Sequence, residues 1–100
     1  MAYACSYDVP STIEMYDEVN KLIGDEPAPG MMAHLVVRSD SGLRHVEVWK
    51  SEADWRRFRE ERVLPAVHEV LRAAGLTEMP AEPFMEELEL VDLRLGLLPH

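Results

Sequence analysis

The sequence contains little of what marks several special classes of protein. Its 100 residues include one cysteine, Cys5, so no disulfide can form within the chain. No apolar run approaches the ~18 residues that suggest a membrane-spanning helix. The first ten residues, MAYACSYDVP, lack the basic start and apolar centre of a secretory signal peptide. We therefore expect a protein of the reducing cytoplasm, with no membrane partner.

Basic residues are also scarce. Ten lysines and arginines stand against nineteen aspartates and glutamates, which gives a formal net charge of −9 at pH 7. Nucleic-acid backbones and anionic membranes repel a chain of this charge, so we expect neither as a partner. The composition, 47% hydrophobic and 29% charged, is that of a globular domain. A domain this small buries only ~60–65% of its unfolded surface, so a second subunit would help to stabilise it.

What the sequence does contain is a strand that runs almost directly into a helix. Apolar and polar residues alternate over residues 43–49, and from Ser51 the apolar residues recur at helical spacing. Ser51 also has the side chain expected of a helix N-cap. Pro65 would clash inside an unbroken helix, which predicts a kink or short break over residues 61–64. Gly75 is expected to end the second helical piece.

The other elements complete a familiar order. Further strands are predicted at residues 2–8, 31–38 and 84–91, and a first helix is expected to begin at Ser11 and end at Gly24. The order β-α-β-β-α-β predicts an α+β, ferredoxin-like sandwich, in which a four-stranded antiparallel sheet carries both helices on one face. We expect residues 1–92 to form this single domain. The apolar tail, residues 93–100, is expected to pack at a dimer interface.

The stretches VEVWKS, SEADWRRF and REERVLPA resemble the dimeric α/β-barrel superfamily, and specifically its antibiotic-biosynthesis-monooxygenase-like group. The likeness in pattern covers roughly residues 3–91 and is most specific over 46–66. It implies a homodimer whose sheets face each other to form a barrel, with a ligand cavity in each subunit. Some members of this group oxidise aromatic polyketides with molecular oxygen and no cofactor, others degrade haem, and many have no assigned reaction.

The haem-degrading branch can be compared residue by residue. It carries a histidine seventeen positions after the serine of its W-x-S motif, which corresponds here to His68. Where that branch has a tryptophan ten positions earlier, this chain has Phe58. The branch also uses an asparagine on the first strand, whereas the only asparagine here, Asn20, falls in the first predicted helix. One match in three disfavours haem, and we expect no cofactor; the commoner role for His68 is a solvated or hydrogen-bonded helix residue.

The hairpin between the second and third strands predicts a further set of residues. If its loop is symmetric about residues 40 and 41, positions whose numbers sum to 81 lie opposite each other, so His34 faces Glu47. By the same rule Met32 faces Trp49, and Val36 faces His45. Opposed side chains lie ~4.5–5.5 Å apart at Cβ. A carboxylate there can orient an imidazole and raise its pKa, as a general base requires, so His34 and Glu47 are the expected catalytic pair.

This register also predicts the two faces of the sheet. The polar set is expected on the face away from the helices, and the helices are expected to cover the apolar set, namely Ala33, Leu35, Val37, Val46 and Val48. The predicted contacts of a small aromatic or polyketide-type ligand are Tyr3, Tyr7, Trp49, Phe58 and His68. The alternative to a ligand site is that these polar residues form an ordinary cross-strand pair, either at a subunit interface or on a solvated face. His34, His45 and Glu47 could also be read as a metal set, but the spacing supplies neither a closed shell nor a reliable open site, and we expect no metal.

Three kinds of function follow. The favoured one is a small cofactor-independent monooxygenase or cyclase. The others are a barrel that binds a ligand or haem without chemistry, and a structural or interaction module whose cavity is packed shut.

Overall fold

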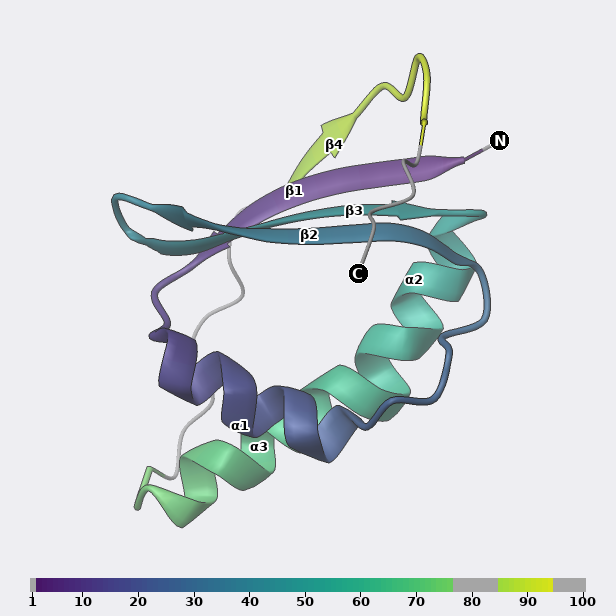
Figure 1. Cartoon of the computed structure of the whole chain (residues 1–100). Helices are drawn as coiled ribbons and strands as arrows, with labels where there is room; N and C mark the ends of the chain where they lie inside the picture. Colours follow the sequence, from purple (N-terminus) through teal and green to yellow (C-terminus); the bar gives the residue numbers. More distant parts are fainter. Residues whose placement is uncertain (1, 77–84, 95–100) are drawn as a thin grey trace, which may run out of the picture.

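A computed structural model describes residues 2–76 and 85–94 of the chain. Its four strands are β1 (Tyr3–Val9), β2 (Met31–Ser39), β3 (Gly42–Trp49) and β4 (Met85–Leu88). They form one antiparallel sheet in the order β2-β3-β1-β4, with all helices on one face (Figure 1). The helices are α1 (Ile13–Ile23), α2 (Glu52–Phe58), the π-helical η1 (Arg59–Val63) and α3 (Leu64–Ala73). The predicted α+β, ferredoxin-like sandwich is confirmed.

The helix starts show where local sequence signals were sufficient. The predicted cap at Ser51 is confirmed, because its hydroxyl oxygen accepts a 3.1 Å hydrogen bond from the amide of Asp54. The predicted start at Ser11 is wrong by one residue. Thr12 is the cap, and its hydroxyl oxygen accepts from the amide of Met15 at 3.1 Å, whereas the Ser11 hydroxyl donates to the Thr12 carbonyl.

The interruption predicted before Pro65 is present as a π-helical segment rather than as a break. Leu64 donates its amide to the carbonyl of Arg59, five residues earlier, so the helix widens by one residue for about a turn. Pro65 then lies in the first turn of α3, where a residue without an amide proton is tolerated. The second helix therefore continues as three joined pieces that curve under the sheet (Figure 1).

The predicted hairpin register is confirmed over most of its length. His34 pairs with Glu47, and Val36 pairs with His45. An irregularity between Met31 and Ala33 shifts the register by one residue, so Trp49 pairs with Met31 and not with Met32.

The prediction of which face the helices cover is wrong. Cys5 and Trp49 are fully buried and form the core with Trp55 of α2, while Phe58 packs against them. Strand alternation then puts His45 and Glu47 on the same inner, helix-covered face. The apolar set is on the outer face, where Leu35 is 61% exposed and Val37 is 49% exposed. Trp49 and Phe58 lie with their ring centroids 5.3 Å apart, so the aromatic side chains of β3 and α2 share one core.

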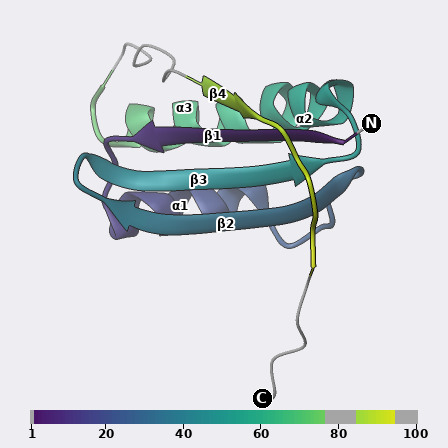
Figure 2. The same ribbon diagram turned by 90° about the horizontal axis from the view of Figure 1, so that it is seen from above.

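The chain after β4 crosses the sheet on its outer side. Residues 89–94 pass over β1, β3 and β2 in the view from above (Figure 2). Of the predicted last strand, Phe84 lies outside the described residues, and the strand ends at Leu88. Residues 95–100, most of the predicted tail, also lie outside the described part. None of the described helices is long and apolar enough to cross a membrane.

Candidate functional site

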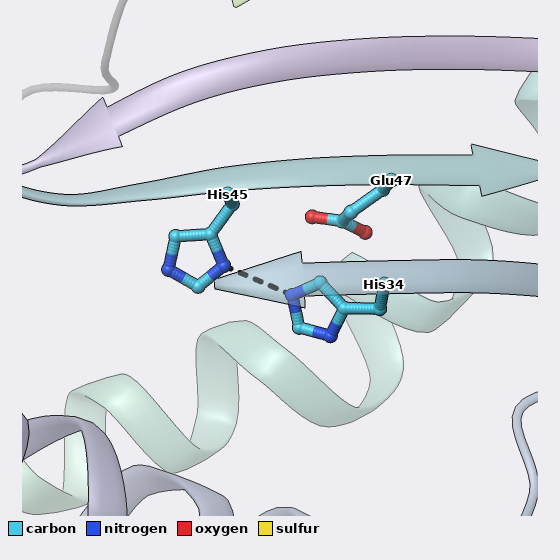
Figure 3. Close-up of side chains that lie close together, drawn as sticks. All are labelled: His34, His45 and Glu47. Carbon is cyan, nitrogen blue, oxygen red and sulfur yellow. Dashed lines mark hydrogen bonds between the residues drawn. The ribbon is translucent and has the colours of Figure 1, made fainter. Parts of the chain in front are cut away.

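Three neighbouring strands bring polar side chains together on the inner face. On β3, His45 and Glu47 are two residues apart and point the same way. His34 lies opposite Glu47 on β2, and Tyr7 lies opposite His45 on β1. We call these four residues the inner polar cluster; Figure 3 shows its two histidines and its carboxylate above the helices.

Glu47 is the buried anchor of the cluster. It is only 4% exposed, and each of its carboxylate oxygens accepts a hydrogen bond. The Tyr7 hydroxyl donates to Oε2 at 2.5 Å, and the Trp49 indole N–H donates to Oε1 at 3.0 Å. Burial, followed by the charge of Glu47, raises the pKa of the Tyr7 hydroxyl, so Tyr7 stays protonated and remains a donor. These two donors satisfy a group whose burial would otherwise be costly.

The two histidines form a hydrogen-bonded pair. His34 Nε2 and His45 Nδ1 are 3.0 Å apart, and the donor is set by the tautomers of the two rings. The His45 ring stacks on Tyr7 with centroids 4.8 Å apart and an interplanar angle of 5°. Tyr16 of α1 meets His45 edge-on at 5.8 Å. Burial and the neighbouring His34 lower the pKa of His45, so its neutral form is favoured near pH 7.

The predicted pair of His34 and Glu47 is therefore present in register but not as a direct hydrogen bond. The hydrogen bond of His34 shown by the structure goes to His45. The ligating atoms of His34, His45 and Glu47 nevertheless all lie within 4.8 Å of one another. His45 lies two residues from Glu47 on the same strand, and it is the residue that the predicted catalytic pair omitted.

Exposure increases across the cluster from the core to the sheet edge. Glu47 is buried, His45 is half-buried and His34 is exposed, because β2 is an edge strand. His34, at the β2 edge of the sheet, is therefore the member of the cluster most open to solvent. Two surface hollows lie elsewhere, one along α2 and η1 and one between α1 and α3, and no residue of the cluster lines either.

The remaining predicted ligand contacts have other surroundings. Tyr3 packs its ring on Trp55 at 5.4 Å, and Trp49 packs on Phe58 at 5.3 Å, so these rings fill the core beside the cluster. His68 is exposed on α3, and among the described residues no hydrogen bond or ring contact joins it to the cluster. Tyr16, which contacts His45 from α1, was not among the predicted site residues.

The comparisons with known proteins identify a fold. No protein-family model and no curated protein matches this chain. Among solved structures, a "putative Antibiotic biosynthesis monooxygenase" from Chloroflexus aurantiacus J-10-fl superimposes with a TM-score of 0.58 over 94% of this chain and 97% of that one. The two chains share one fold. They are 17% identical in sequence, so the similarity to this antibiotic-biosynthesis-monooxygenase-like protein shows a common fold alone. This is the fold that the family resemblance of the strand-to-helix stretch implied.

Proposed function

We propose that this protein carries out acid–base chemistry on a small acidic aromatic or polyketide-type molecule, as a monooxygenase or cyclase that needs no cofactor. The observation that supports this most is the hydrogen-bonded pair of His34 and His45 beside the buried Glu47. The fold shared with the Chloroflexus protein favours the same class.

In the proposed reaction a neutral imidazole of the pair accepts a proton from the substrate. His45 suits this role because its lowered pKa favours the neutral ring near pH 7, and when its Nδ1 donates to His34 its Nε2 lone pair can accept a proton. The negative Glu47, which Tyr7 and Trp49 hold in place, stabilises the imidazolium that forms. His34, which is exposed, passes the proton on to water.

For a monooxygenase the deprotonated carbon then reacts with molecular oxygen. A ring CH2 group and O2 give a ring carbonyl and one water, so one oxygen atom enters the product and both substrate hydrogens leave. An anthrone is a suitable probe because its ring CH2 is acidic and its oxidation product is a coloured quinone.

The test is oxygen uptake by the full chain with an anthrone, in buffer that contains a metal chelator. We expect one O2 consumed per quinone formed, at a rate well above that without protein. The His68→Ala variant serves as a control and is expected to keep the wild-type rate, since His68 lies outside the cluster. Wild-type uptake no faster than the uncatalysed rate would overturn the proposal.

We also propose that two copies pair through the outer face of the sheet. Its apolar side chains, Leu35 and Val37 above all, are exposed in the single chain. Burying them against a second sheet would contribute ~25 cal/mol per Å² of apolar surface. The barrel implied by the family resemblance has the same arrangement.

Glutamates at Leu35 and Val37 together are expected to dissociate this dimer. At the interface each introduced carboxylate would be buried against the second subunit without a partner. This raises the dissociation constant at least ~100-fold, or about 2.7 kcal/mol. Analytical ultracentrifugation should then give the monomer mass of 11.4 kDa in place of twice that value. The Leu22→Glu variant, changed on the exposed side of α1, should remain a dimer. A wild-type protein that is monomeric at tens of micromolar would contradict the pairing.

A further inference from the structure

The inner polar cluster also has the composition of a metal site. Two imidazole nitrogens and a carboxylate, from His34, His45 and Glu47, lie within 4.8 Å of one another. We propose that they bind one divalent first-row transition-metal ion through His34 Nε2, His45 Nδ1 and a Glu47 oxygen. This goes beyond the function proposed above and does not rest on it, since binding is measured without a substrate.

The separation of the two nitrogens matches that of neighbouring metal ligands. Metal-bound imidazole nitrogens lie ~2.0–2.1 Å from the ion. At that length, nitrogens 3.0 Å apart subtend about 94° at the ion, close to the angle between adjacent octahedral or tetragonal ligands. An ion can thus replace the shared proton of the pair if each ring rotates to turn its lone pair toward a common point.

Glu47 can complete the set with a small movement. Ligands on opposite sides of an ion lie ~4.2 Å apart at these bond lengths, so a separation of at most 4.8 Å needs a shift of roughly half an ångström. Its oxygens each accept one hydrogen bond, from Tyr7 and from Trp49, and each keeps a second lone pair. Those two donors would act as outer partners that orient the ligand.

The donor set and its surroundings select the kind of ion. Two imidazoles with one carboxylate suit zinc, cobalt, nickel, copper or iron, whereas calcium and magnesium prefer oxygen ligands alone. A cation would also offset the buried negative charge of Glu47. The exposed His34 at the sheet edge gives the ion a way in and leaves coordination positions open to water. Because the ion would occupy the histidine lone pairs, it would prevent them from acting as bases while it is bound.

Titration of the chelator-treated full chain with Zn²⁺ in a calorimeter tests the proposal. We expect one ion per chain in the wild type. His34→Gln, His45→Gln and Glu47→Gln should each weaken binding at least ~100-fold, since loss of an outer partner alone costs ~10–100-fold. Matched controls are His68→Gln on α3 and Glu26→Gln between α1 and β2, both exposed and expected to bind as the wild type does. No binding by the wild type, or equal loss in the controls, would overturn the proposal.

A second readout needs no variant and so does not depend on how well the variants fold. Co²⁺ is a paramagnetic substitute for Zn²⁺, and the Trp49 indole N–H donates directly to Glu47, whereas Trp55 lies on α2. In an NMR spectrum the Trp49 indole signal should shift or broaden at one equivalent of Co²⁺, well before that of Trp55. Equal effects on both indole signals, or none, would contradict a site at this cluster.

Discussion

Replacing His45 by glutamine is expected to lower the rate of anthrone oxidation about 100- to 10,000-fold, the range that general-base catalysis contributes. Glutamine is close to histidine in size and can still hydrogen-bond to His34, but it cannot accept a proton near pH 7. The loss should therefore fall on kcat, with KM little changed. Oxygen uptake in chelating buffer measures both constants.

The matched control for this change is His68→Gln, which makes the same substitution on the exposed face of α3. It should retain the wild-type rate. Equal rates for the His45 variant and the wild type would remove His45 from the chemistry, and a loss in the His68 variant would place the chemistry elsewhere.

Replacing Trp49 by alanine is expected to lower the free energy of unfolding by about 3–5 kcal/mol. Trp49 is fully buried against Cys5, Trp55 and Phe58, so alanine leaves a large cavity. It also removes the indole donor to Glu47, which leaves a buried carboxylate oxygen one hydrogen bond short. Because small domains are stable by only ~5–15 kcal/mol, the variant should unfold at a far lower urea concentration.

Leu22→Ala provides the comparison, since Leu22 is 53% exposed on α1 and its truncation should cost only about 0.5–1 kcal/mol. This pair of variants also tests the orientation of the sheet. Had the helices covered the other face, as the sequence predicted, Trp49 would be peripheral and its loss would cost no more than that of Leu22.

The fold could be predicted because its signals are local. The change from alternating to helical spacing at Ser51, the cap there and the interruption before Pro65 all depend on residues close in sequence. The start of α1 was placed one residue early because Ser11 and Thr12 are both good caps, and only the backbone geometry decides between them.

The face of the sheet could not be predicted in the same way. Alternation in β3 shows that His45, Glu47 and Trp49 share a face, but it does not show which face the helices cover. Hydrophobicity favoured the valine-rich side. The structure instead places Trp49 against Phe58 and leaves Leu35 exposed, on the face through which we propose that two copies pair.

The hairpin register predicted only part of the candidate site. The register rule placed His34 opposite Glu47 correctly, because the two-residue turn fixes the hairpin. The irregularity between Met31 and Ala33 makes Met31 the partner of Trp49, and no residue type in that stretch predicts it. The contact between His34 and His45 is diagonal across the strands, so it depends on side-chain rotamers and not on register.

The most direct test of the proposed function is a crystal structure with an anthraquinone bound, since the proposed site lies on the helix-covered face of the sheet. The ligand should lie against His34 and His45 from the side of β2, with one of its oxygens about 2.7–3.2 Å from an imidazole nitrogen. A ligand bound on the outer face, or beside His68 with the inner polar cluster unoccupied, would contradict the proposed function.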